Sequence, residues 1–190
     1  MELWHLRRQA LLETRAARLV RWTDDENHMN AAEPLPYTTH LRVALALARG
    51  IAAARGDTDL TPIHAALGLL REGENAAVAM LGHAGVSLDR VRHDLEIALG
   101  ELGRPRREEV VLPLTDGERG LVQEARSQAQ LRGDPFVGPQ HILLALLQAS
   151  ESPAAQVFIG HGFTHDAGLT HLDAVIVRHE HTPDASGPAV

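Results

Sequence analysis

The stretch RGDPFVGPQHILLALL, residues 132–147, has a near copy earlier in the chain, RGDTDLTPIHAALGLL at residues 55–70. The offset of 77 between them also aligns residues 37–99 with 114–176 without a gap, giving 18 identities in 63 positions. Chance gives roughly one identity in twelve in a chain so rich in alanine and leucine. Because turn residues align with turn residues as well, the chain contains an internal duplication.

Each unit is predicted to contain four helices. Apolar residues at helical spacing predict a first helix over residues 38–55, and Thr115-Asp116-Gly117-Glu118 forms a capping box for its counterpart. The second helices read as apolar nearly all round, which is typical of helices at the centre of a core. Glycines suited to a left-handed residue after a helix and prolines suited to a first turn mark the element ends in both units. These residues are Gly56, Gly133, Pro62, Pro139, Gly85 and Gly162.

The predicted architecture is all-α, with two tandem pseudo-symmetric four-helix units preceded by an amphipathic helix. No segment shows the alternation of apolar and polar residues that a strand requires. The expected divisions are an N-terminal helix and acidic loop over 1–36, a first repeat over 37–99, a linker over 100–113, a second repeat over 114–178 and a flexible tail over 179–190.

The composition excludes several classes of function. The chain has no cysteine, which removes disulfides, thiolate nucleophiles and cysteine-ligated metals. All 18 basic residues are arginine, so a P-loop or Schiff-base lysine is excluded. The net charge of −7 disfavours a nucleic-acid partner. We find no stretch long enough for a membrane span and no apolar core of a secretory signal, and we therefore expect a cytoplasmic protein without a membrane partner.

The repeated pattern resembles the double Clp-N motif. It combines an aromatic-threonine start at Tyr37-Thr38, a histidine at the entry to the second helix, and an isoleucine- and leucine-rich run after it. This motif forms the amino-terminal domain of Hsp100/Clp unfoldases of the ClpA and ClpC type, and the resemblance covers residues 37–177. It implies a mobile recognition module that receives substrates and adaptor proteins for an ATP-driven ring.

Two departures from the family pattern bear on function. The sequence has no Gly-x-x-x-x-Gly-Lys-[Ser/Thr] motif, so it resembles the recognition domain standing alone, without the AAA+ engine. The glutamates that precede the motif histidine in ClpC-like members are replaced by Ile63 and Gln140. Those glutamates are associated with recognition of phosphorylated arginine, and isoleucine cannot accept a hydrogen bond from a guanidinium group. Phospho-arginine recognition is therefore not expected here.

The resemblance also implies a binding surface where the first helices of the two repeats approach each other. The residues that it places there are Tyr37, Arg42, Leu45, Arg49, Leu114, Arg119 and Gln123. Arg42 and Arg49 share one helix face, and Arg119 and Arg126 repeat that geometry. Four guanidinium groups could face an acidic partner, or the same face could simply be solvated.

The twelve histidines give two further interpretations. His64 and His141 occupy equivalent positions and are predicted to be buried and hydrogen-bonded to a neighbouring loop. His161 and His165 have helical spacing, which is the basis for an alternative metal-dependent enzyme. No His-Glu-x-x-His helix accompanies them, so the leading prediction includes no metal, no cofactor and no catalytic residue.

The leading functional prediction is a non-enzymatic binding module. It would recognise a Clp component, an adaptor or substrate protein, or a peptide-like ligand in the groove between the repeats. Its role would be to regulate Clp proteolysis or to act as a decoy for ligands of the Clp N-domain. The alternatives are the metal-dependent enzyme and a regulatory protein that binds its partner through the arginine-rich helix over residues 3–22.

Overall fold

The computed structural model describes residues 35–102 and 116–180. Within those ranges the chain forms eight helices, four in each repeat, and the predicted all-α architecture is confirmed. The first repeat contains α2 (Thr39–Arg55), α3 (Pro62–Glu72), α4 (Ala76–His83) and α5 (Leu88–Glu101). The second contains α6 (Asp116–Arg132), α7 (Pro139–Gln148), α8 (Pro153–Gly160) and α9 (His165–Glu180).

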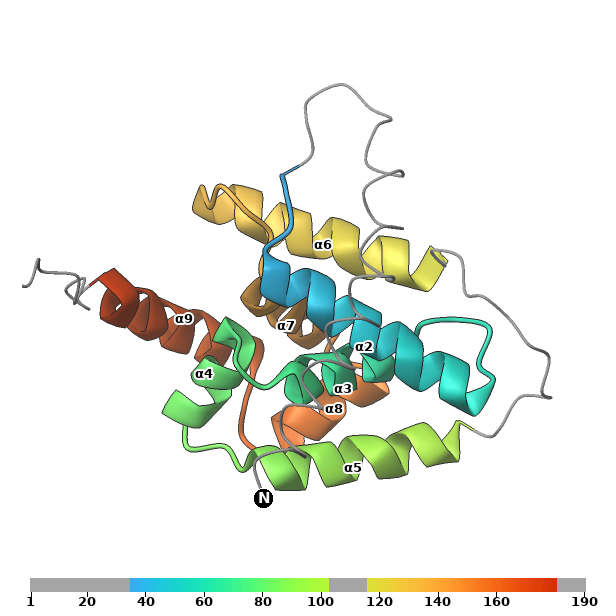
Figure 1. Ribbon diagram of the computed structural model, residues 1–190. Coiled ribbons are helices and arrows are strands. Elements are labelled where there is room, and N and C mark those ends of the chain that lie inside the picture. Colours follow the sequence, from blue (N-terminus) through green and yellow to red (C-terminus); the bar gives the residue numbers. More distant parts are fainter. Residues whose placement is uncertain (1–34, 103–115, 181–190) are drawn as a thin grey trace, which may run out of the picture.

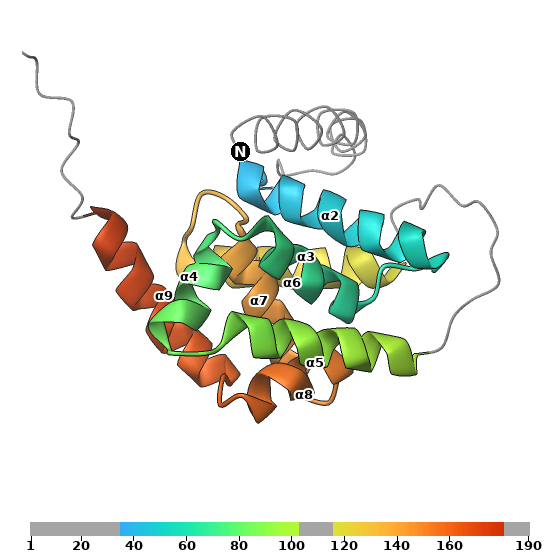
Figure 2. The same ribbon diagram turned by 60° about the horizontal axis from the view of Figure 1, so that its bottom comes forward.

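The two repeats share a single core. Helices α3 and α7 lie at the centre, with α2 packed on α3 and α6 packed on α7, and α5 and α8 lie against each other on the opposite side (Figure 1). Helix α4 of the first repeat packs against α9 of the second, as both views show (Figure 2). One continuous cluster of buried apolar side chains runs through both repeats. Neither repeat therefore has a separate core.

The central position of α3 and α7 follows from their sequences. In α3 every residue from Ile63 to Leu70 is buried, and in α7 every residue from His141 to Leu147 is buried. A helix that is apolar on all sides must be surrounded by other elements, because no face of it can be left in water. The outer helices α2 and α5 bury only one stripe each.

The helix ends lie where glycine, proline and small polar residues predict them. The Thr38 side chain caps α2, and Gly56 ends it in the left-handed conformation with a φ of 82°. Gly133, Gly85 and Gly162 also have positive φ values, which cost glycine little. The last turns differ from the prediction, since α5 extends to Glu101 and α9 to Glu180, past the expected starts of the linker and the tail.

A buried histidine fixes the start of each central helix. Nδ1 of His64 accepts a hydrogen bond from the Thr61 backbone N–H at 3.1 Å, and Nε2 lies 3.0 Å from a carboxylate oxygen of Asp57. His141 repeats this arrangement with Gly138 at 3.0 Å and Asp134 at 2.8 Å. We call each arrangement a histidine clasp. The predicted structural role of both histidines is confirmed.

The clasp requires a neutral imidazole. A backbone N–H can only donate, so Nδ1 must be the acceptor and Nε2 must carry the proton that it donates to the carboxylate. Burial lowers the pKa of His64 and of His141, and the neighbouring aspartates Asp57 and Asp134 only partly oppose this effect. Protonating Nδ1 would place two donors against each other and open the first turn of the helix.

Helices α2 and α3 approach closely at one glycine. A Cβ added at Gly68 would collide with the carbonyl oxygen of Ala44 and would lie 2.9 Å from Cβ of Ala48. In the second repeat the position that matches Gly68 is Ala145. The first pair of helices therefore packs with backbone against backbone, whereas the second pair accommodates a methyl group.

Several predicted segments lie outside the described residues. They are the N-terminal amphipathic helix, the acidic loop, the capping residue Thr115, and nearly all of the linker and the tail. Among the described helices, none is long and apolar enough by itself to span a membrane. Helices α7 and α8 pass that test only when taken together, across a bend of 97°.

Candidate functional site

Two arginines at equivalent positions of the repeats connect α2 to α6, and we call the boundary between these two helices the seam. Arg49 of α2 donates to the Glu118 carboxylate of α6, with Nη2 2.6 Å and Nε 3.1 Å from the same oxygen. Arg126 of α6 donates to the Tyr37 hydroxyl at 2.8 Å and lies over its ring, 5.2 Å from the centroid. The start of each helix therefore meets the later part of the other, so α2 and α6 run antiparallel.

A short backbone bridge adds to this seam. The Thr38 N–H donates to the Val137 carbonyl at 3.0 Å, and the Val137 N–H donates to the Pro36 carbonyl at 2.9 Å. Tyr37 is thereby held on the loop that precedes α7. Burial raises the pKa of the Tyr37 phenol, and the Arg126 guanidinium opposes that rise, so the side chain is a neutral hydroxyl that can accept.

Glu118 is a buried carboxylate in an otherwise apolar position. Its side chain is 1% exposed, and the matching residue of the first repeat is Leu41, which lies in the core. A carboxylate removed from water needs a cation and hydrogen bonds to remain charged. Arg49 supplies both, with two nitrogens directed at the carboxylate. This guanidinium is therefore part of the framework.

The seam leaves three of the seven predicted surface residues accessible. Arg119 and Gln123 are exposed on α6, and Arg42 is partly exposed on α2 between the two cross-repeat contacts. Three others are engaged inside the protein. Leu45 is only 4% exposed and packs in the core, while Tyr37 and Arg49 join the repeats. The expectation that Leu45 lines an open groove and that Arg49 faces a partner is corrected accordingly. Leu114 lies outside the described residues.

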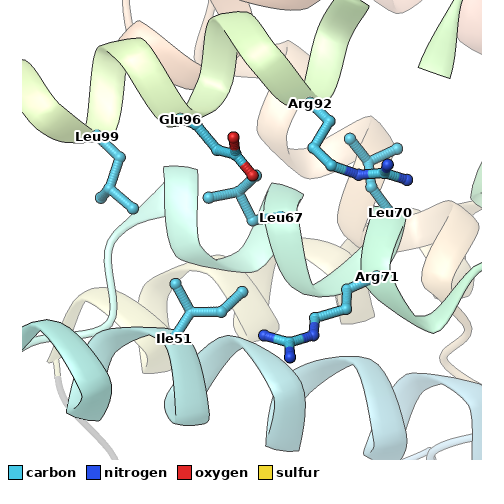
Figure 3. Close-up of a pocket in the computed structure, with 7 residues that line it drawn as sticks. All are labelled: Ile51, Leu67, Leu70, Arg71, Arg92, Glu96 and Leu99. Atoms are coloured by element: carbon cyan, nitrogen blue, oxygen red, sulfur yellow. The ribbon is translucent and has the colours of Figure 1, made fainter. Parts of the chain in front are cut away.

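A groove that the sequence did not indicate opens within the first repeat. Its volume is about 450 Å³, and it is lined by α2, α3 and α5. Figure 3 shows α3 running between the other two helices, with its leucines directed into the groove. The lining residues are Ile51, Leu67, Leu70, Arg71, Arg92, Glu96 and Leu99.

The histidines of the metal hypothesis do not gather. His161 pairs with Asp94 through Nε2 at 2.7 Å, and His165 lies 4.0 Å from its neighbour Asp166. Within the part of the chain that the structure describes, no three histidine or carboxylate side chains are arranged to hold a metal ion. A different pair does meet across the repeats, His83 of α4 and His171 of α9, with their Nδ1 atoms 3.0 Å apart.

The family described as the Clp repeat (R) N-terminal domain matches residues 36–161. The match covers more than half of the chain and includes seven of the eight described helices. The chain belongs to the Clp repeat N-terminal domain family.

Known Clp proteins show the same relationship. The chain is 26% identical over 151 residues to the negative regulator of genetic competence ClpC/MecB of Bacillus subtilis, covering 80% of this chain and 18% of that protein. It is 29% identical over 121 residues to the chaperone protein ClpB of Oceanobacillus iheyensis, covering 64% of this chain and 15% of that chaperone. The chain thus spans less than a fifth of the length of these curated relatives.

Solved Clp N-domains share the fold. The N-terminal domain of the ClpV1 ATPase from Escherichia coli superimposes with a TM-score of 0.60 at 20% identity, covering 85% of this chain and 90% of that one. The N-terminal domain of Hsp104 from Candida albicans gives 0.59 at 18% identity, covering 72% and 89%. At these identities the likeness establishes the fold alone. The Clp repeat fold is itself a non-catalytic module, and no AAA+ sequence is present within these 190 residues.

Two residues depart from the Clp repeat pattern at the position just before the motif histidine. Ile63, in the first turn of α3, lies in the core and is 2% exposed. Gln140, in the first turn of α7, is partly exposed. A buried isoleucine offers no acceptor to a ligand guanidinium. The first repeat therefore has no polar side chain at this point of the motif, and the expectation that phosphorylated arginine is not recognised stays a prediction.

Proposed function

We propose that this Clp repeat domain is a binding module that receives a peptide segment of a partner protein along the seam between α2 and α6. The observation that carries the proposal is the seam itself. Two cross-repeat contacts fix its ends, and Arg42, Arg119 and Gln123 remain accessible along it. A rigid framework with accessible polar side chains lowers the ordering cost of binding.

The occupant that fits this seam is an acidic segment. Guanidinium groups recognise carboxylates with two parallel hydrogen bonds, and Arg42 and Arg119 occupy equivalent positions on the two helices. A related solved structure is described as a complex of the ClpV N-domain with a VipB peptide, which supports peptide binding by this fold. In the proposed role the domain acts in the cytoplasm and regulates Clp proteolysis, either as an adaptor or as a decoy for N-domain ligands.

Partner capture with matched charge variants tests this function. The full chain is immobilised beside Arg119→Glu, which reverses a charge on the seam, and Arg90→Glu, which makes the same change at an exposed position of α5. We expect Arg119→Glu to lose the retained protein and Arg90→Glu to keep it. Isothermal titration with the purified partner then gives the affinity, with the double variant Arg42→Glu, Arg119→Glu as the strongest perturbation. Equal retention by both single variants would remove the seam from consideration.

A further inference from the structure

The groove of the first repeat has an apolar floor and a charged rim. Leu67, Leu70 and Leu99 are buried residues that form the floor, and Ile51 closes it on the α2 side. Arg71, Arg92 and Glu96 stand at the rim. In the view of Figure 3 the two arginines lie toward one end of the groove, and Ile51 and Leu99 lie toward the other. The groove therefore has an apolar end and a cationic end.

We propose that this groove is a second binding site, which takes a partner segment carrying a leucine-sized side chain next to an acidic residue. The apolar side chain would lie on the leucine floor, and the carboxylate would meet Arg71 and Arg92. Glu96 would accept a hydrogen bond from a backbone N–H of the same segment. The volume of about 450 Å³ falls within the range of roughly 300–1,000 Å³ that is typical of ligand pockets.

The charged side chains at the rim determine which kind of ligand the groove favours. Arg71 is exposed and makes no ion pair with any residue in the described parts of the chain. Arg92 bonds Asp89 at 3.1 Å, but the Asp89 side chain is 92% exposed, so this pair is weak and easily exchanged for a ligand carboxylate. Two guanidinium groups beside an apolar floor form a local cationic site on a chain whose net charge is −7. Such a site favours an anionic apolar ligand over a neutral one.

The second repeat shows what the same region looks like without these features. At the positions that match Ile51 and Arg71 it has Gln128 and Gln148, which are hydrogen-bonded to each other at 2.5 Å. Leu169 stands where the first repeat has Arg92. The amide pair therefore ties α6 to α7 at the place where the first repeat is open and charged. The cationic groove is a property of the first repeat and not of the Clp repeat pattern.

The test uses the full chain and defined synthetic peptides. The probe is a nine-residue peptide, acetyl-Gly-Ser-Leu-Glu-Ala-Leu-Glu-Gly-Ser-amide, followed by methyl NMR of leucine- and isoleucine-labelled protein. One matched peptide replaces both glutamates with glutamine, and another replaces both leucines with alanine. We expect the probe to shift the methyl signals of Ile51, Leu67, Leu70 and Leu99. The glutamine peptide should bind about threefold more weakly, because exposed ion pairs contribute little each. The alanine peptide should bind about tenfold more weakly, because it buries less apolar surface.

Two charge variants locate the effect. Arg92→Glu should weaken binding of the probe about tenfold, since it replaces an attraction with a repulsion. Arg90→Glu makes the same charge change two residues away on α5, does not line the groove, and should bind the probe like the unmodified chain. Thermal melting confirms that both variants fold. Equal affinities for the two variants, or shifts confined to the α2–α6 seam, would overturn the proposal.

A failure of the groove proposal can be distinguished from a failure of the function proposed for the seam. Partner capture depends on Arg42 and Arg119 of the seam, whereas the peptide titration depends on Arg92 of the groove. A chain that captures its partner but shows no groove shifts with millimolar probe has a working seam and no second site. Groove shifts in a chain that captures nothing would support the second site alone.

Discussion

The two repeats have the same four helices and the same histidine clasp, yet residues at equivalent positions make different contacts. Arg49 and Arg126 match each other, and both reach across to the opposite repeat. The first meets a buried carboxylate and the second a tyrosine hydroxyl, because the residues that they contact have diverged. After duplication the framework residues are retained, and the contacts between the copies become asymmetric. The binding surfaces proposed above depend on that asymmetry.

The largest effect should come from Arg49, which is the one of the two matching arginines whose partner is a charged side chain. Arg49→Ala removes this guanidinium from the buried Glu118 carboxylate, and we expect a loss of about 3 kcal/mol in the free energy of unfolding. Arg126→Ala removes a hydrogen bond to a neutral hydroxyl and should cost about 1 kcal/mol. Urea denaturation followed by circular dichroism measures both.

A double variant serves as the control for this comparison. Glu118→Leu introduces the residue that the first repeat has at Leu41, so Arg49→Ala combined with Glu118→Leu should recover most of the lost stability. If the double variant is as unstable as Arg49→Ala alone, the buried carboxylate is not the reason for the difference between the two arginines.

The packing of the paired helices should give the next largest effect. Gly68→Ala forces a methyl group against the Ala44 carbonyl, and we expect a loss of about 1–3 kcal/mol in spite of the better helix propensity. Ala145→Gly at the matching position should cost about 1 kcal/mol, mainly through backbone entropy. Gly50→Ala on the open side of α2 meets no atom within 4 Å and should stabilise the protein by up to about 1 kcal/mol. A stabilising Gly68→Ala would show that the two helix pairs do not differ.

The histidine clasps, which are common to both repeats, predict a pH dependence. Their folded pKa values lie below the ordinary value of 6.5, so the unfolded chain binds more protons in mildly acidic solution. The stability that they contribute is complete above pH 6.5 and decreases as the pH falls from there toward the folded pKa values. Replacing either histidine by glutamine should reduce this slope of stability against pH.

Melting temperatures between pH 8 and pH 5 measure the slope. The control is His93→Gln, an exposed residue on α5, which should leave the slope unchanged. Equal slopes in all the variants would show that the clasps do not exclude the proton.

The smallest effect concerns the outer contacts between the repeats. Asp94 of α5 pairs with His161, and the residue that matches Asp94 in the second repeat is His171, which meets His83 instead. His171→Asp would give α4 and α9 an acid–histidine pair like that of α5. We expect a gain of about 0.5 kcal/mol in the free energy of unfolding, because a carboxylate would face the His83 ring nitrogen in place of a second imidazole. Chemical denaturation at pH 7 tests it, and an unchanged or lower free energy of unfolding would contradict the electrostatic explanation.

The helices were predictable from the sequence because their ends are marked locally. Proline at the first turn, a polar cap and a glycine after the last turn act within a few residues, and α2, α3 and α7 begin and end close to the predicted positions. The buried role of His64 and His141 was also predictable, since both copies place a histidine inside an apolar helix. Local signals of this kind do not depend on how the repeats pack.

The seam and the groove were not predictable in detail because they depend on residues far apart in sequence. Helical spacing places Arg42 and Arg49 on one face, but it does not show that a carboxylate 69 residues later is directed at Arg49. One signal was present in the internal alignment, where Glu118 stands opposite the core residue Leu41. A charge in a core position of one copy indicates a buried partner. The groove left no such signal, because it arises from three substitutions spread over three helices.

The sequence separation between the residues that meet at the seam also affects how the chain folds during its synthesis. A ribosome adds about 5–20 residues per second, so roughly 3–14 seconds separate the synthesis of Arg49 from that of Glu118. During that interval the apolar sides of α3 that α7 will cover have no partner. The first repeat leaves the ribosome with an incomplete core, and the nascent chain depends on its second half to complete it. A pause in translation anywhere between the synthesis of α3 and that of α7 would lengthen the interval during which these apolar sides are exposed.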